Sequence, residues 1–328
     1  MPESVTEVAA QVHLWLKASI KIMLNCKKSI LTFIFLCCAL INARAQHTFN
    51  SGTSRLNMLQ DSLLRLERLV QDAPSNTERF ADNAQFVKTL VKALKIPGSY
   101  NFGFDSVKYL SIVKSPDKAF RIFSWAVAAD DGTYRFFGAI QMATKDGQLK
   151  LYPLIDATEE IKDNNEITSN KKWFGSRYYE IVPVVNSGKQ TFYILLGWKG
   201  NTIKTTKKVI EILSFEKDEV IFGKNVLEST KNGPFKNRIV FEYNKLNSMT
   251  LRLDKTVGMV VFDHLVPLSP DMTGNFEYYG SDSSFDAYRP VGGHLKLVEN
   301  VELKNNPNEK DELYTDPKNK KITPIKKL

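Results

Sequence analysis

The sequence predicts an α+β protein that is mainly β, with an N-terminal pair of amphipathic helices followed by about ten mostly antiparallel strands. Two observations support this fold class. Apolar residues recur at three- and four-residue steps between residues 55 and 94, which is the period of a helix with one buried face. After Gly98 the chain changes to short runs of β-branched and aromatic residues separated by turn residues, a pattern typical of strands. A meander, a barrel, a sandwich and a propeller all agree with this pattern.

The helical segment is predicted to cover residues 46–98. Its first helix runs from Arg55 to just before Pro74, and its apolar face consists of Leu56, Leu59, Leu63, Leu66 and Val70. Its second helix has Asn76 or Thr77 as N-cap and stops at Pro97, with an apolar face of Phe80, Ala84, Val87, Leu90, Val91 and Leu94. We expect these helices to be packing elements. Alternatively they present an apolar face to a partner, which requires the leucines of the first helix to stay unburied.

The β-rich domain is predicted to cover residues 99–300 and to contain several hairpins. The runs 119–127 and 133–143 flank Asp131-Gly132, a dipeptide typical of a tight hairpin turn. Further hairpins are predicted for 176–186 with 190–198, and for 207–223 with a turn at 216–219. The runs 238–243, 249–253 and 259–265 are predicted to form a three-strand meander. From 301 to 328 the chain is polar and rich in lysine, which indicates a disordered tail.

Residues 23–45 have the three-part layout of a secretory signal peptide. Lys27 and Lys28 precede an apolar stretch from Ile30 to Ile41, and Ala43-Arg44-Ala45 places small residues before a cut at Gln46. As a helix, this apolar stretch spans about 18 Å, whereas a bilayer core needs about 30 Å. We therefore expect cleavage, no stable membrane span afterwards, and a secreted or periplasmic protein.

Two alternatives remain open at this end of the chain. A lipoprotein would carry its lipid on Cys37 or Cys38, although neither follows the usual small residue. Residues 1–22 precede an internal start at Met23 and form a doubtful upstream extension, which reflects either a misplaced start codon or a long leading region.

Signal cleavage changes which chemistry is available. All three cysteines, Cys26, Cys37 and Cys38, lie within the leader, so the exported chain is expected to be cysteine-free and to lack thiol nucleophiles, thiolate zinc sites and disulfides. Beyond residue 45, 40 basic residues stand against 34 acidic ones, leaving a mild charge of +6. Without a dense basic stripe or a recognisable motif, we expect no nucleic-acid partner.

Asp263 and His264 stand side by side in the run 259–265 and raise the question of a catalytic pair. Neighbouring residues of a strand point to opposite faces, so a hydrogen bond within this pair is disfavoured. We expect Asp263 to bond backbone N–H groups at the strand end and His264 to pack or hydrogen-bond across the sheet. A ligand-binding role for both residues is the alternative.

Asp282, Ser284 and Asp286 alternate in the next polar cluster, as the first ligands of a calcium loop do. A full EF-hand loop would need glycine at 287 and glutamate at 293, where the chain has Ala287 and Gly293. We therefore expect an Asp/Ser-rich turn and no metal site, with a simpler calcium site built from distant ligands as the alternative.

Aromatic residues provide the remaining binding candidates. Tyr278 and Tyr279, together with nearby Phe285 and Tyr288, offer stacking surfaces for a sugar, and Trp173 and Trp198 each lie close to glycine. The alternative for all of them is packing within a β-domain, where aromatic residues dominate the core.

Motif searches identify no catalytic residues. The chain contains no G-x-S-x-G, P-loop or H-E-x-x-H motif, and we expect no cofactor. Beyond the leader, the only histidines are His47, His264 and His294, too few for a histidine-rich metal site. Paired carboxylates stay open, because such partners need not be close in the chain.

Several runs carry a resemblance to a known family. F-R-I-x-S-W at 120–125, L-L-G-W-x-G at 195–200 and V-F-D-H-L-x-P at 261–267 resemble a family of uncharacterised secreted bacterial proteins that has no assigned activity. The resemblance covers about residues 55–300 and implies export, but it implies no catalytic residue.

Together these observations favour an exported, non-enzymatic binding or envelope-associated protein whose partner is a glycan or an envelope protein. The alternative is a periplasmic or secreted hydrolase that acts on a polymer through two of Asp263, Asp282 and Asp286. It requires two carboxylates within about 5–10 Å of each other in a concave pocket.

Overall fold

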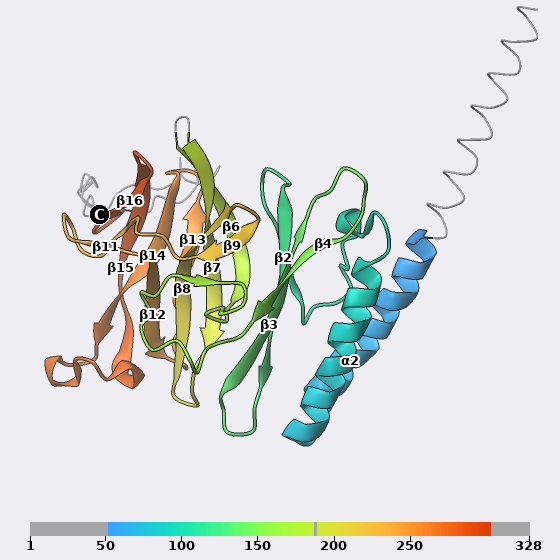
Figure 1. Cartoon of the computed structure of the whole chain (residues 1–328). Helices are drawn as coiled ribbons and strands as arrows, with labels where there is room; N and C mark the ends of the chain where they lie inside the picture. Colours follow the sequence, from blue (N-terminus) through green and yellow to red (C-terminus); the bar gives the residue numbers. More distant parts are fainter. Residues whose placement is uncertain (1–51, 187–188, 303–328) are drawn as a thin grey trace, which may run out of the picture. The chain divides into compact units, whose positions relative to one another are not determined.

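A computed structural model describes residues 52–186 and 189–302 of the chain (Figure 1). The predicted extension, the signal peptide and nearly all of the polar tail lie outside the described residues. The chain divides into two compact units. The first comprises the residues up to Asp72 together with Ala81–Val107 and Lys145–Leu149, and the second comprises Ala73–Phe80, Lys108–Thr144 and the chain from Lys150 onward. Among the described helices, none has the length and apolar character needed to span a bilayer.

Two helices account for most of the helical structure, as the apolar period predicts. The first covers residues 52–72, and α2 covers Asn76–Leu94, followed by the short η1 at Ser99–Asn101. The predicted face of the first helix is buried, with Leu63 fully inaccessible and Leu56, Leu59 and Leu66 at most 9% exposed. The condition for a partner-binding apolar face on this helix is therefore not met.

Two details of α2 differ from the prediction. Ser75 caps the helix in place of Asn76 or Thr77, because its Oγ accepts the N–H of Glu78 at 3.3 Å and donates to the carboxylate of Glu78 at 3.1 Å. Ala84 is exposed. The buried side of α2 consists of Asn83, Phe86, Leu90, Ala93 and Leu94, so the stripe is rotated relative to the predicted one.

The second unit contains three sheets, and sixteen strands occur in the described residues. Among these strands only one pair is parallel, β10 with β16 through Leu227 and Leu295. The mainly β, largely antiparallel fold is thus as predicted, but the strands are more numerous. Pieces of two residues, such as 168–169, 227–228 and 235–236, leave no pattern in the sequence, and the long strand Tyr279–Val291 runs through the Asp/Ser-rich cluster, for which a turn was predicted. The first sheet has the order β1 (Ser111–Lys114), β2 (Phe120–Ala128), β3 (Tyr134–Met142) and β4 (Lys150–Ile155).

The central sheet has the order β5 (Thr168–Ser169), β9 (Glu219–Phe222), β8 (Thr205–Glu216), β7 (Lys189–Gly200) and β6 (Arg177–Asn186), and β12 (Arg238–Asn244) pairs with β8 beside β9. The third sheet has the order β11 (Phe235–Lys236), β10 (Leu227–Glu228), β16 (His294–Val298), β15 (Tyr279–Val291), β14 (Met259–Pro267) and β13 (Leu251–Asp254). Between β14 and β15 lie η2 (Pro270–Met272) and η3 (Phe276–Tyr278).

All three predicted hairpins are confirmed as β2–β3, β6–β7 and β8–β9. The β8–β9 turn joins Glu216 to Glu219 through Lys217 and Asp218, both with positive φ. The predicted meander is wrong, because β12 pairs with β8 in the central sheet whereas β13 and β14 pair within the third sheet. The loop after β12 therefore carries the chain from one layer to the next.

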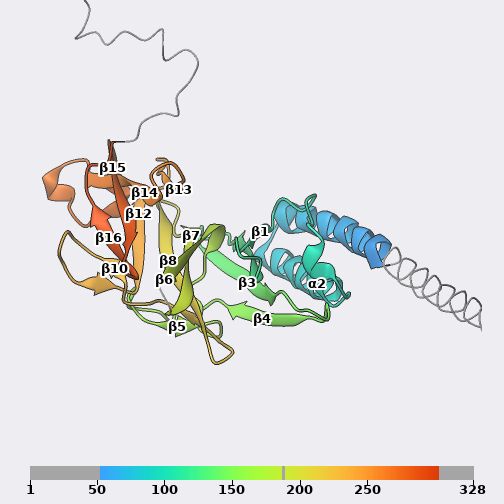
Figure 2. The ribbon, with the colours of Figure 1, turned by 90° about the horizontal axis from the view of Figure 1, so that it is seen from above.

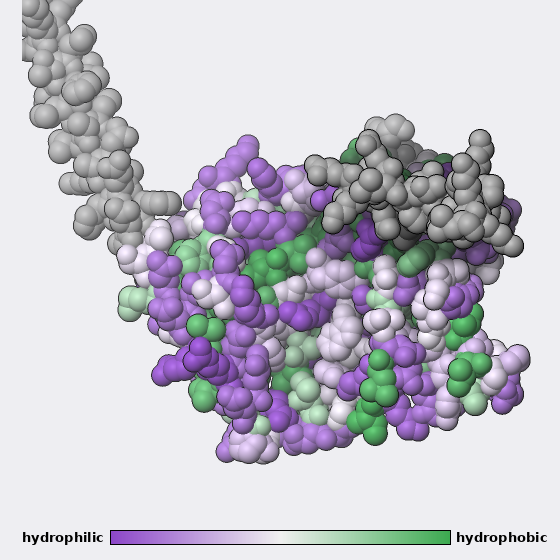
Figure 3. Space-filling model, turned by 180° about the vertical axis from the view of Figure 1, so that it is seen from behind, coloured by the Kyte–Doolittle hydropathy of each residue, from purple (hydrophilic) through white to green (hydrophobic). Residues whose placement is uncertain are grey.

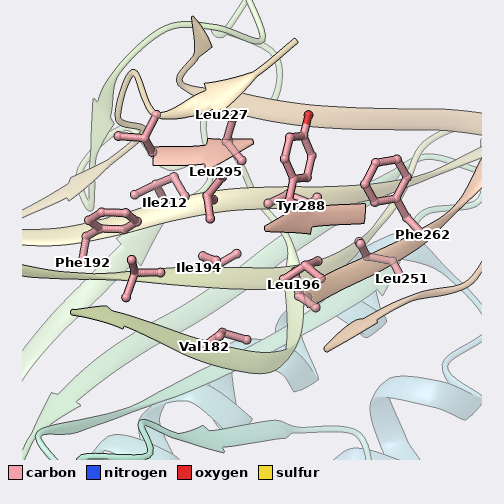
Figure 4. Close-up of a cluster of buried hydrophobic side chains, with 14 of the residues drawn as sticks. Val182, Phe192, Ile194, Leu196, Ile212, Leu227, Leu251, Phe262, Tyr288 and Leu295 are labelled. Carbon is pink, nitrogen blue, oxygen red and sulfur yellow. The ribbon is translucent and has the colours of Figure 1, made fainter. Parts of the chain in front are cut away.

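The central sheet lies between the other two, and Figure 2 shows the three layers of this unit in succession. Side chains of a strand alternate between faces. Tyr193 and Leu195 of β7 accordingly join a core with the first sheet, and Ile194 and Leu196 join a core with the third (Figure 4). Burying each such side chain contributes about 1.5–3 kcal/mol, so both faces of the central sheet stabilise the unit.

Candidate functional site

His264 forms its side-chain hydrogen bond with Asp286 of β15 and not with its sequence neighbour Asp263. The Nδ1–Oδ2 distance is 2.8 Å, and a register shift between Asp263 and Leu265 occurs in β14 at this point. The hydrogen bond that the imidazole donates to Asp286, together with the charges of Asp286 and Asp282, raises the pKa of His264 against the opposing effect of burial. The bond joins neighbouring strands, so it is the cross-sheet hydrogen bond that was predicted for this histidine. The imidazole itself is about half exposed.

Asp263 ties down backbone, as predicted. Its Oδ2 accepts the N–H of Thr250 at 2.9 Å, and its own N–H donates to Thr250 O at 3.2 Å. Asp286 is also buried, and its Oδ1 accepts the N–H of Asn300 at 3.0 Å. Both carboxylates thus have backbone partners that fix their positions.

Asp282 is exposed and closes a local turn, since its Oδ1 accepts the N–H of Ser284 at 2.9 Å and the hydroxyl of Ser284 at 2.7 Å. These two bonds hold the pKa of Asp282 below its ordinary value. Across the described ranges, no group of three metal-ligating side chains is close enough to hold an ion. The side chains of the Asp/Ser-rich cluster cap the backbone as predicted, but the cluster lies within strand β15, at the register shift opposite His264, and not in a turn between two elements.

Trp173 is a core residue and does not line a surface. Its side chain is inaccessible, its ring lies 6.5 Å from that of Phe136 in an edge-on arrangement, and its indole N–H donates to the hydroxyl of Tyr178 at 2.8 Å. Trp198 is partly buried, and its indole N–H donates to Thr206 Oγ1 at 2.8 Å. A groove that joins Trp173 to the tyrosines of β15 is therefore ruled out, because Trp173 packs in the core with the first sheet and Tyr288 in the core with the third.

Tyr278 lies at the surface, beside a depression of about 400 Å³. Asn244 at the end of β12 and Asn247 just after it form part of its lining. Leu268, Glu277 and Tyr278, from the segment that joins β14 to β15, form another part. The side chain of Tyr278 is 40% exposed. The volume is within the range of small-ligand sites.

Exposed apolar side chains occur in the segments that form this depression, where Leu268 and Tyr278 are lining residues and Leu246 and Phe276 are sequence neighbours of lining residues. Leu246 is 94% and Leu268 80% exposed, and Phe276 is exposed to the same degree as Tyr278. We call Leu246, Leu268, Phe276 and Tyr278 the Tyr278 surface. Figure 3 shows hydrophobic residues of one face of the molecule as separate small areas among hydrophilic ones. Separate small apolar areas of this kind do not indicate a large protein interface.

The polar groups of the depression are held in place by the backbone. Asn244 Nδ2 donates to Glu277 O, and Asn247 Nδ2 donates to Tyr279 O at 3.1 Å. Tyr279 is half buried, its hydroxyl accepts the N–H of Gly274 at 3.0 Å, and its ring lies 5.1 Å from that of Phe276. Tyr279 therefore supports the loop, whereas Tyr278 is the aromatic residue that is presented to solvent.

Glu277 forms an ion pair at the same place, with its Oε2 2.6 Å from Lys204 Nζ. The hydrogen bond from Lys204 holds the pKa of Glu277 below its ordinary value, so the carboxylate is charged at neutral pH. The depression thus combines one exposed aromatic ring, two anchored amides and one charged carboxylate.

A second polar cluster, which the sequence analysis missed, is buried in the central sheet. Arg238 of β12 and Glu211 of β8 have inaccessible side chains and form an ion pair at 2.5 Å. The hydroxyl of Tyr178 donates to the other oxygen of Glu211, and burial together with the Glu211 charge raises the pKa of Tyr178 well above its ordinary value. Trp173, Tyr178, Glu211 and Arg238 thus form one chain of hydrogen bonds.

Lys199 is buried nearby and anchors the segment that joins β4 to β6. Its Nζ donates to Thr158 Oγ1 at 2.7 Å and to the carbonyls of Phe174 and Gly175 at 2.5 and 2.9 Å. Thr158 in turn donates to Asp156 Oδ1 at 2.5 Å. Burial lowers the pKa of Lys199 to about 7, and the charge of Asp156 opposes this shift. Every N–H of the ammonium has an acceptor, so the cluster is structural.

The sequence does contain a signal for this cluster. Glu211 interrupts the apolar run 209–213, and Arg238 directly precedes the apolar run 239–241. A charged residue in a strand buried on both faces needs an opposite partner. The Tyr278 surface has a weaker signal, since single apolar residues such as Leu246 and Leu268 within polar loops are common.

Comparisons with known proteins give no relative to this chain: no family model, no curated protein and no solved structure matches it. The residues of the structure itself are therefore the basis for any functional assignment.

Proposed function

We propose that this chain is an exported, non-enzymatic binding protein that holds a glycan against Tyr278. The observation that carries the proposal is the exposed ring of Tyr278 beside a depression of about 400 Å³ that also contains anchored amide groups. The apolar face of a sugar ring packs against an aromatic ring, and amide and carboxylate groups bind hydroxyls.

Fixed polar groups favour recognition, because little side-chain entropy is then lost on binding. Asn244 and Asn247 are fixed by bonds to the backbone, and Glu277 is fixed by Lys204. The leader-like layout of residues 23–45 supports export, and a secreted or periplasmic protein meets glycans of the envelope.

The geometry favours binding over hydrolysis. Hydrolysis of a glycosidic bond normally uses two carboxylates on opposite sides of the bond. Among the lining residues of this depression Glu277 is the one carboxylate, and its pairing with Lys204 makes it a poor acid. Asp263 and Asp286 are occupied elsewhere by Thr250, Asn300 and His264.

Binding to immobilised oligosaccharides and to soluble peptidoglycan fragments tests this proposal. Tyr278→Ala is expected to weaken binding at least tenfold, because stacking of a flat ligand face on an aromatic ring contributes on the order of 1–3 kcal/mol. Tyr278→Phe keeps the ring and is expected to retain most of the affinity. Val257→Ala, at an exposed position 43% accessible in the β13–β14 turn, is the matched control.

Two results would count against the proposal. One is that none of these glycans binds to the unaltered protein at millimolar concentration, and the other is that Tyr278→Ala binds as well as Val257→Ala. Release of new reducing ends from a bound glycan would favour the hydrolase instead.

A further inference from the structure

β12 leaves one backbone edge open. It pairs with β8 in unbroken register, from Arg238 opposite Glu211 to Asn244 opposite Thr205. Within the described part of the chain, the backbone of residues 239–243 makes no hydrogen bond other than those to β8. A regular edge with free N–H and C=O groups is a template for another strand.

Two other sheet edges of this unit have partners for part of their outer backbone. Ile155 of β4 exchanges bonds with Asn170 and Trp173, at 2.8 Å each. The N–H of Leu253 in β13 donates to Glu180 Oε2 at 3.0 Å.

The edge strand β6 is protected in a different way, since two register shifts interrupt its pairing with β7. Shifts of this kind twist an edge and discourage further pairing. Among the described strands, two regular edges without register shifts therefore remain, β1 with four paired residues and β12 with seven, and β12 offers the longer template for a further strand.

We propose that β12 pairs antiparallel with β12 of a second copy of this chain, which would join the two central sheets into one. Two identical edges related by a two-fold axis satisfy each other's hydrogen bonds at the same time. An axis through Val240 places Ile239 opposite Phe241 of the second copy, and Phe241 opposite Ile239. Aromatic residues opposite β-branched ones form favourable cross-strand pairs.

The side chains of β12 agree with this register. Ile239 and Phe241 are only partly buried within their own copy, so additional apolar contact remains available to both. Arg238 is satisfied by Glu211, and Glu242 by Thr205 and Asn201 at 2.8 Å each. The axis therefore brings no unpaired charge into the contact, and this self-complementarity is the reason for choosing a second copy as the occupant.

Site-specific cross-linking tests the register. The chain is expressed in full, with Cys26, Cys37 and Cys38 replaced by serine, and carries a single new cysteine. Val240→Cys is expected to give a covalent dimer with a short bismaleimide, because residue 240 lies opposite itself across the axis. Val257→Cys, exposed in the β13–β14 turn, is the control and is expected to give at least tenfold less dimer.

Analytical ultracentrifugation tests the association itself. One strand pair buries less surface than a standard interface, so a dimer that forms only at micromolar or higher concentration is expected. Val240→Lys places two positive charges opposite each other and is expected to weaken the dimer at least tenfold, whereas Val240→Thr keeps a β-branched residue and is expected to preserve it. Thermal melting of each variant separates loss of pairing from loss of folding.

Three outcomes would overturn the inference. The first is a protein that stays monomeric at several hundred micromolar and whose Val240→Cys variant cross-links no more than the control. The second is a dimer that Val240→Lys does not weaken. The third is protection of the amides of residues 239–243 from hydrogen exchange only when a different envelope protein is added, which would assign the edge to another partner.

Discussion

Replacing Glu211 by leucine is expected to destabilise the second unit strongly. Arg238 and Glu211 both have inaccessible side chains, and 2.5 Å separates the closest nitrogen and oxygen. Removing one partner of a buried pair leaves an uncompensated charge, at a cost of about 3–5 kcal/mol. The hydroxyl of Tyr178 also loses its acceptor, which adds about 1–3 kcal/mol.

The combined loss of about 4–8 kcal/mol is comparable to the whole stability of a typical domain, about 5–15 kcal/mol. Glu211→Leu is therefore expected to be largely unfolded or to unfold at much lower urea concentration. Glu211→Gln, which keeps an acceptor for Tyr178 but removes the charge, serves as the milder variant with an expected loss of about 2–4 kcal/mol. Its unfolding is measured by urea titration, followed by tryptophan fluorescence.

The double variant Glu211→Leu with Arg238→Met distinguishes a charge effect from a packing effect. Replacing both partners removes the unpaired charge, so its free energy of unfolding is expected to exceed that of Glu211→Leu alone, and the two single losses are expected not to add. The bonds from Arg238 to the carbonyls of Asn164 and Glu166 are lost as well, but Asn164 is exposed and its carbonyl can bind water. A loss below about 1 kcal/mol for Glu211→Leu, or strictly additive losses, would refute this reasoning.

Two further predictions concern pH and proton binding. Lys199 has a pKa of about 7 in the folded chain and an ordinary value in the unfolded chain. The unfolded chain therefore binds more protons than the folded chain above pH 7, so the free energy of unfolding rises with pH. Urea titrations are expected to show a gain of about 2–3 kcal/mol from pH 7 to pH 9, and Lys199→Met is expected to lack this gain. The pKa of His264 is raised because of Asp286, so the small stabilisation from this pair is present at low pH and is lost as pH rises through the raised pKa. An NMR titration of Asp286→Asn is expected to give a lower pKa for His264 than a titration of the unaltered chain. An unchanged pKa would contradict Asp286 as the cause.

The elements that the sequence predicts well are those whose signals are local. Hairpins such as β8–β9 depend on a turn of a few residues and on alternation within a single run, and both are readable along the chain. The first helix was predictable because one apolar face, from Leu56 to Val70, extends over about four turns. The placement of β12 depends instead on whether the loop between β12 and β13 turns back within one sheet or crosses to another layer. No residue of that loop distinguishes the two paths.

Trp173 illustrates why the candidate site was harder to predict than the fold. A tryptophan beside glycine agrees equally with a ligand groove and with a core, because both bury an aromatic ring. The decisive observation is the acceptor for its indole N–H, which is the hydroxyl of Tyr178, five residues later. That contact needs the backbone turn through Gly175, whose φ of 76° suits glycine, and the pairing of Tyr178 with Glu211 of another strand.

The same buried ion pair bears on the open edge of β12. Arg238 and Glu211 are direct register partners across β12 and β8, and their side chains meet on one face of the sheet. A slip of one residue would place Arg238 on the opposite face, away from Glu211, and would leave both charges buried without a partner. The pair therefore specifies a single register for β12, so that residues 239–243 are presented in one fixed order. A strand edge that an internal charge pair holds in one register can pair with a second copy only about one defined two-fold axis. The cross-link at residue 240 and the stability of the Glu211 variants therefore both report on the register of β12.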